Sequence, residues 1–137
     1  MKYLIDTHTL LWAITDEVQL PKKVFDILSR PDENKILVST VSFWEIAIKT
    51  SIGKMTLENF DMNKLIEYCE SLGFSIISLE PEDSLFYAKI PIKPNHKDPF
   101  DRMLIATAIN NGFTLISKDD NMPLYISDGL SFLWGNK

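Results

Sequence analysis

Short apolar runs alternate with longer helical segments along the chain, and this alternation limits the folds that the chain can adopt. The runs at 2–5, 36–39, 74–78 and 113–117 have the length and character of buried strands. Helical segments separate them, and proline or glycine marks several of their ends. Strands that alternate with helices predict an α/β fold with a parallel sheet and right-handed crossovers.

The segments between these runs predict helices, and one further strand is expected near the end of the chain. Gly73 and Gly112 directly follow two of the segments, where glycine commonly ends a helix. The expected helices are 7–14, 22–29, 41–50, 63–72, 81–88 and 99–111, and the expected edge strand is 130–134. A chain of 137 residues is long enough for one domain with its own core, so we expect residues 1–137 to form a single domain.

Four acidic residues stand where an apolar run ends or a helix begins: Asp6, Glu45, Asp101 and Asp119. The carboxyl ends of parallel strands line one crevice, where ligands bind. Four carboxylates gathered there would repel each other, and their pKa values would rise unless a cation joined them. Oxygen ligands without sulfur or clustered histidine select a hard cation such as Mg²⁺ or Mn²⁺. The sequence therefore predicts a metal site suited to phosphate-ester chemistry.

Each acid also has a purely structural explanation. Ser42 and Glu45 fit a capping box, with Ser42 as the N-cap. Asp98 fits the N-cap of the next helix, with Asp101 in its first turn, and Asp6 can cap the first helix. The fourth acid can belong to a polar turn. Capping alone does not require acids at the ends of several separate elements, whereas a metal site does.

Composition excludes several other kinds of site. The single cysteine excludes an internal disulfide and a cysteine-based zinc site. His8 and His96 are too few for a histidine-rich metal site, and each is better explained as a structural or surface residue. The net charge of −5 argues against a simple nucleic-acid-binding module, which usually has a basic face. The same net charge is compatible with an enzyme whose acidic centre is surrounded by basic side chains.

The sequence also predicts a location. Asp6 interrupts the apolar start of the chain before a secretory signal could form. No apolar run approaches the roughly 18 residues that a membrane span requires. We therefore expect a cytoplasmic protein without a membrane partner.

A set of short motifs, in this order, resembles the PIN-domain family, and most closely its VapC toxin branch from bacterial toxin–antitoxin pairs. The motifs are Leu4-Ile5-Asp6-Thr7-His8-Thr9-Leu10-Leu11-Trp12, Val38-Ser39, Ser42-Phe43-Trp44-Glu45-Ile46-Ala47-Ile48-Lys49, Gly53-Lys54, His96-Lys97-Asp98-Pro99-Phe100-Asp101-Arg102-Met103-Leu104-Ile105-Ala106 and Leu115-Ile116-Ser117-Lys118-Asp119. The resemblance runs from Met1 to about Tyr125, and the ordered set is highly specific. It implies a single PIN-like domain, with three α/β/α layers around a central, mostly parallel sheet.

The resemblance implies a ribonuclease that depends on Mg²⁺ or Mn²⁺. Its catalytic and metal-binding acids fall on Asp6, Glu45, Asp101 and Asp119, which we call the acidic quartet. Asp120, next to Asp119, is an alternative for the fourth acid, and the spacing from Ser117 favours Asp119. One departure is Thr107, where many relatives have Gln, on a helix away from the acids.

Substrate contacts are expected at Ser117, Lys49 and Arg102, with Lys118 as a further cation. In relatives, Thr often stands at the position of Ser117 and keeps the hydroxyl. Lys49 and Arg102 are expected to contact RNA phosphates. Structural roles stay open: Ser117 as a strand-end hydroxyl, Lys49 as a solvated cation, and Arg102 as a partner of Asp98 or Glu45.

The resemblance implies that this chain is the toxin of a type II pair, masked by a cognate antitoxin, and leaves a homodimer open. An antitoxin requires an apolar groove for an amphipathic helix, and a basic side chain that enters the acidic crevice. The groove candidates are Trp12, Phe43, Trp44, Ile46 and Ile48, for which burial in the core is the simpler explanation.

Three other functions compete with this interpretation. A phosphatase with Asp6 as nucleophile commonly has a second acid two residues later, where this chain has His8. A catalytically silent PIN-like scaffold would keep the fold without activity, although an intact quartet argues against it. A housekeeping PIN nuclease would cleave RNA without an antitoxin.

Overall fold

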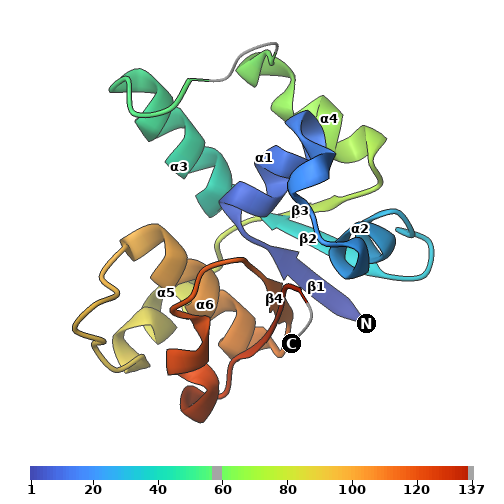
Figure 1. The fold of residues 1–137 in the computed structure, drawn as a ribbon. Coiled ribbons are helices and arrows are strands. Elements are labelled where there is room, and N and C mark those ends of the chain that lie inside the picture. The colour runs from blue at the N-terminus through green and yellow to red at the C-terminus, as the bar shows by residue number, and fades with distance from the viewer. Residues whose placement is uncertain (57–59, 136–137) are drawn as a thin grey trace.

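The computed structural model describes residues 1–56 and 60–135, built around a five-stranded sheet (Figure 1). The strands are β1 Lys2–Ile5, β2 Lys35–Ser39, β3 Ser75–Ile77, β4 Thr114–Ile116 and β5 Ser131–Leu133. They lie in the order β3-β2-β1-β4-β5, and every pairing is parallel. The predicted α/β fold and the last edge strand are therefore confirmed.

Helices connect these strands close to the expected positions. The α-helices are α1 Thr7–Thr15, α2 Lys22–Leu28, α3 Thr40–Ser51, α4 Leu65–Ser71, α5 Pro81–Phe86 and α6 Pro99–Asn111. Short 3₁₀ helices are η1 Glu17–Gln19, η2 Met62–Lys64, η3 Tyr87–Lys89 and η4 Met122–Asp128. The expected helix at 63–72 is divided between η2 and α4, and η4 was not expected from the sequence. Within the described ranges, no helix is long and apolar enough to cross a membrane.

Two apolar clusters lie on opposite faces of the sheet. Because successive side chains of a strand point to opposite faces, Tyr3 and Ile5 belong to one cluster and Leu4 to the other. The first cluster includes side chains of α1, α2 and α4, and the second includes side chains of α6 and η4. Figure 1 shows α1, α2 and α4 on one side of the sheet and α5 and α6 on the other. The three-layer architecture is confirmed.

Polar side chains fix the first residues of the helices that follow the strands. Asp6 caps α1, and Asp98 caps α6 by accepting hydrogen bonds from two backbone amides of its first turn. The expected N-cap at Ser42 is wrong, because the Ser39 hydroxyl accepts from the Val41 amide at 3.0 Å and α3 already begins at Thr40. The caps bring the first turns of three helices to the carboxyl ends of the central strands.

Candidate active site

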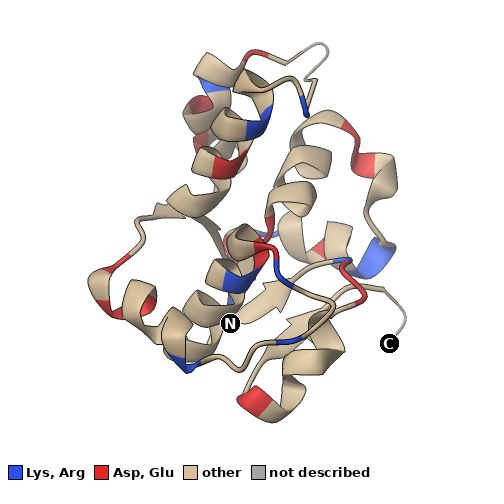
Figure 2. Cartoon of the chain, turned by 90° about the vertical axis from the view of Figure 1, so that its left-hand side faces the viewer, with Lys and Arg blue, Asp and Glu red and all other residues tan. Residues whose placement is uncertain are grey.

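The acidic quartet comes together at one edge of the sheet. Asp6 follows β1, Asp119 lies beyond β4, Asp101 lies in the first turn of α6, and Glu45 lies in the second turn of α3. Asp6, Asp101 and Asp119 line one pocket, and the charge of Glu45 also acts on Asp101. In Figure 2, acidic segments of separate elements lie near the centre of the view, beside basic segments. Convergence of this kind exceeds what helix capping requires.

Asp6 both caps α1 and belongs to the site. The Thr9 amide donates to Asp6 Oδ1 at 2.9 Å, and the carboxyl is buried. Burial raises the pKa of Asp6, while hydrogen bonds from Ser117 and Thr9 lower it in part. The net shift is upward, so the protein holds this carboxyl where a negative charge is costly unless a cation accompanies it.

Glu45 is buried and uses both carboxylate oxygens. The Thr7 hydroxyl donates to Oε1 at 2.6 Å, and Lys49 Nζ, one turn later in α3, pairs with Oε2. The hydrogen bond to Glu45 is the main cause that raises the pKa of Lys49. The Lys49 side chain is about one quarter exposed, at 27%, so it also reaches the rim of the site.

His96 joins two acids of the quartet. Its Nε2 lies 3.4 Å from Oδ2 of Asp101 and 3.4 Å from Oδ2 of Asp119. Candidate ligand atoms of these three residues lie within 4.8 Å of one another. From the sequence, a structural or surface role is the simpler explanation for His96; it is buried, with 4% exposed, and lies inside the site. Its position five residues before Asp101, in the same motif, was the signal available.

Asp101 lies among several other carboxyl groups. Burial first, and then the charges of Asp98, Asp119, Asp6 and Glu45, raise the pKa of Asp101 to about 8. A carboxyl in this position holds its proton near neutral pH unless a cation replaces it. Asp6, Asp101 and Asp119, which line one pocket, supply the oxygen ligands that a hard divalent cation prefers.

The loop after β4 orients Asp119 through short local bonds. The Asn121 amide and side chain donate to Asp119 Oδ1 at 2.8 and 3.0 Å, and the Asp119 amide donates to the Ser117 hydroxyl at 3.1 Å. Asp119, rather than Asp120, belongs to the group of converging ligand atoms. Ser117 is buried beneath this turn, which favours an orienting role for its hydroxyl.

The expected contact between Arg102 and substrate phosphates does not fit the structure. Arg102 is buried, with 5% exposed, and its guanidinium donates to the carbonyls of Ile90 and Pro91 at 3.2 Å each. It also donates to the hydroxyls of Tyr125 at 3.1 Å and Tyr87 at 3.4 Å. These partners also replace the acids with which it was expected to pair. Arg102 points away from solvent and organises the interior.

The contribution of Asp101 to the stability of the metal-free protein is expected to fall as pH rises from about 4 to about 8. The folded state raises the pKa of Asp101 from 3.8 to about 8, so between these values it keeps a proton that the unfolded chain releases. This contribution to stability is fully present below pH 3.8 and is lost as pH rises through 8. Asp101→Asn should therefore flatten the dependence. Thermal unfolding in EDTA across this range measures it, and an unchanged slope in the variant contradicts the assignment.

Comparisons with known proteins place this geometry in a family. The PIN domain model matches residues 3–125. No curated protein matches the chain. Among solved structures, VapBC2 from Rickettsia felis bound to promoter DNA is 16% identical over 100% of both chains, with a TM-score of 0.70. VapBC-1 from nontypeable Haemophilus influenzae is 18% identical over 97% of both chains, with a TM-score of 0.62.

A third structure, FitAcB from Neisseria gonorrhoeae, is 19% identical over 96% of both chains, with a TM-score of 0.63. At these identities, the likeness to solved structures shows a shared fold. The family model covers most of the chain, including all four acids of the quartet. The chain therefore belongs to the PIN domain family.

Proposed function

We propose that this protein is a metal-dependent endoribonuclease and the toxin of a type II toxin–antitoxin pair. The observation that carries the proposal is the convergence of the acidic quartet, with raised pKa values at Asp6 and Asp101. PIN domains are generally nucleases, which makes phosphodiester hydrolysis the expected reaction. The choice of RNA rests on the family resemblance. A cytoplasmic location stays a prediction.

Mg²⁺ or Mn²⁺ would be held by the quartet: Asp6, Glu45, Asp101 and Asp119. Such an ion, when bound, lowers the pKa of its water and offsets charge that grows on the phosphoryl oxygens. The residues fit it because mutual repulsion among the acids contributes to the raised pKa of Asp101, and a cation relieves that repulsion.

Two lysines at the rim are suited to guiding the RNA backbone toward the acids. Lys118 lines the same pocket as Asp6 and Asp101, and its Nζ lies 5.6 Å from the centre of the Trp12 ring. Lys49 is held at the rim by its pair with Glu45 and lies 5.9 Å from the Phe100 ring. We propose these lysines as phosphate contacts in place of Arg102. The Ser117 hydroxyl would act by orienting the turn that carries Asp119.

Cleavage is expected to require the metal. Purified protein, free of any partner, is incubated with structured RNA and with single-stranded DNA of matched sequence, with Mg²⁺, with Mn²⁺ or with EDTA. The proposal expects RNA cleavage with either ion and none in EDTA. Equal cleavage in EDTA contradicts the metal mechanism, and preferred cleavage of DNA contradicts the assigned substrate. A protein that cleaves neither but still binds an antitoxin would fit the silent scaffold instead.

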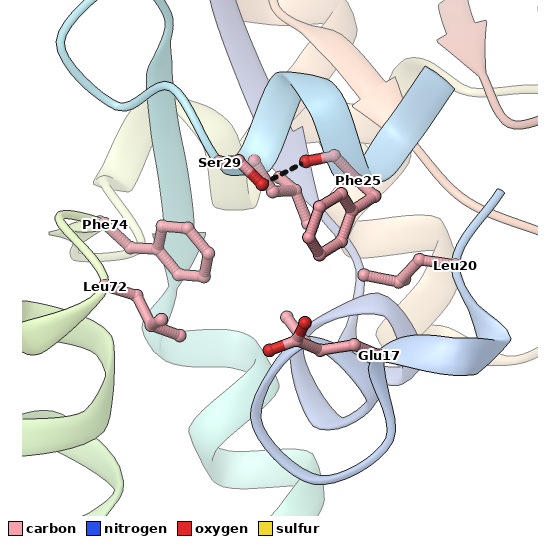
Figure 3. A pocket seen from close by; sticks show the side chains of 8 residues that line it. Glu17, Leu20, Phe25, Ser29, Leu72 and Phe74 are labelled. Carbon is pink, nitrogen blue, oxygen red and sulfur yellow. Dashed lines mark hydrogen bonds between the residues drawn. The ribbon is translucent and has the colours of Figure 1, made fainter. Parts of the chain in front are cut away.

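An apolar pocket between α1, α2 and α4 supports an antitoxin partner. Its lining includes Leu20, Phe25, Leu72 and Phe74, and Figure 3 shows these side chains around the hollow. Phe25 is 40% exposed, a large apolar side chain that a partner can cover. The solved structures named above include VapBC2 and VapBC-1, and we propose that an amphipathic antitoxin helix places an apolar side chain here.

Two of the residues expected to form the antitoxin groove have other environments. Ile46 is fully buried in the core and cannot contact a partner. Trp44 is 62% exposed, but it lies over a different apolar pocket with Val41, Leu79 and Met103. A homodimer stays a prediction.

A further inference from the structure

Arg102, Tyr125 and His96 form a buried chain of hydrogen bonds that ends at the acidic quartet. Arg102 donates to the Tyr125 hydroxyl at 3.1 Å, and that hydroxyl lies 2.8 Å from Nδ1 of His96. All three side chains are buried. At the far end, His96 Nε2 faces Asp101 and Asp119. A buried polar chain of this kind has to satisfy each of its members, because an unpaired group in the interior is costly.

The donors in this chain fix the position of the imidazole proton. A guanidinium only donates, so the Tyr125 oxygen is the acceptor in its contact with Arg102. The Tyr125 hydrogen then needs an acceptor, and the hydroxyl's other partner is Nδ1 of His96. If Nδ1 carried a proton instead, the buried Tyr125 hydrogen would be left unpaired. In the neutral imidazole, the proton therefore lies on Nε2.

The Nε2 atom lies near both carboxylates. It makes a long hydrogen bond of 3.4 Å with Oδ2 of Asp101, and Oδ2 of Asp119 lies at the same distance as a charge partner. Asp101 belongs to α6 and Asp119 to the loop after β4, so His96 links two elements. A protonated Nε2 has no lone pair to offer a metal. This geometry suits a group that positions metal-binding acids better than one that binds the metal itself.

The loop that carries His96 is anchored by the same network. Arg102 holds the carbonyls of Ile90 and Pro91, where the loop leaves η3. The His96 amide donates to the Lys93 carbonyl at 3.1 Å, and Lys93 Nζ pairs with Asp128 at 2.9 Å. Arg102 directly follows Asp101 in α6. The same helical turn therefore carries a proposed metal ligand, Asp101, and the residue that anchors the loop with His96.

We propose that His96 is a positioning residue, held by Arg102 and Tyr125 as the Nε2-protonated tautomer, which keeps Asp101 and Asp119 together for the metal. The metal part of this inference rests on the proposed function, whereas the tautomer can be measured without any metal. Two measurements therefore test it separately.

The first measurement is the tautomer, read from long-range ¹H–¹⁵N spectra of ¹⁵N-labelled, metal-free protein at a pH where the ring is neutral. The two histidines are assigned with His8→Gln. Wild type and Tyr87→Phe are expected to show His96 protonated at Nε2, because Tyr87 contacts Arg102 at 3.4 Å but is not a partner of His96. Tyr125→Phe should give a mixture of tautomers. A wild-type His96 protonated at Nδ1, or an unaltered tautomer in Tyr125→Phe, overturns the inference.

The second measurement is the affinity for Mn²⁺, by calorimetry, beside thermal unfolding of each variant. His96→Leu removes the donor and should weaken binding by about 10–100-fold, the range seen for groups that orient metal ligands. His96→Gln keeps an N–H donor near the position of Nε2 and should restore most of the affinity. Equal weakening in both variants, or none in His96→Leu, overturns the positioning role. A wild-type protein that binds no Mn²⁺ refutes the proposed metal site. The tautomer measurement then still tests the hydrogen bonds that join Arg102, Tyr125 and His96.

Discussion

Asp6→Asn is expected to lower RNA cleavage by about 10³-fold or more while the fold stays intact, the scale of loss when a preorganised electrostatic group is removed. Asn is as good an N-cap as Asp, so the bond from the Thr9 amide that begins α1 should survive the change. The substitution keeps the volume and removes only the charge. Asp101→Asn should have the same effect for the same reason. Cleavage rates at saturating Mg²⁺ and far-UV circular dichroism measure the two properties together.

Asp98→Asn is the matched control for these variants. Asp98 also caps a helix, accepting from the Phe100 amide at 2.8 Å, and it lies in the same motif as Asp101. It does not belong to the quartet, and Asn can keep its cap, so this variant should retain most of the activity. If Asp6→Asn and Asp101→Asn both cleave RNA at wild-type rates, the site is misassigned.

Expression of the wild-type chain alone is expected to arrest growth of a bacterial host, and expression of Asp6→Asn is not. Uncontrolled cleavage of cellular RNA would harm the cell, and the variant has lost the charge that the reaction needs. Co-expression of the protein encoded immediately upstream should restore growth and yield a complex that co-purifies. Colony counts on inducing medium and affinity purification give the two readouts.

The apolar pocket in Figure 3 offers a control for the antitoxin contact. Phe25→Asp should weaken rescue by the partner, because it places a charge where an apolar side chain is expected to dock. Ile92→Asp makes the same change at an exposed apolar position outside this pocket and should leave rescue unchanged. If the wild-type chain is harmless in cells although it cleaves RNA well in vitro, the toxin assignment is wrong and a housekeeping nuclease is the better account.

Most of the fold was predictable because its signals are local. The buried strands are short apolar runs, and Asp98, Pro99 and Gly112 mark both ends of α6 by rules that involve only neighbouring residues. The convergence of Asp6, Asp101 and Asp119 on one pocket was predictable because each follows a strand or lies near the start of a helix, and parallel strands bring such positions to one edge. The roles of the quartet stay proposals.

The surroundings of the acids were not predictable, because they depend on which side chains become buried together. Arginine is usually a surface residue, yet Arg102 is buried because it donates hydrogen bonds to the backbone carbonyls of Ile90 and Pro91. The position of His96 five residues before Asp101 was the one signal in the sequence, but its role in the site depends on Tyr125, which lies in η4, 29 residues later in the chain. The cap at Ser39 was misplaced at Ser42 because both are serines within reach of the same helix start.

The order of the strands has a consequence for the time at which activity can appear during synthesis. β1 is synthesised before β4, yet it lies in the middle of the sheet and pairs with β4. Asp6 and Asp119 lie on these two parts of the chain, so a nascent chain that lacks β4 and the loop beyond it has an incomplete quartet. The proposed metal site can therefore form only after the loop beyond β4 has been synthesised, so the proposed activity depends on the folding of the later part of the chain.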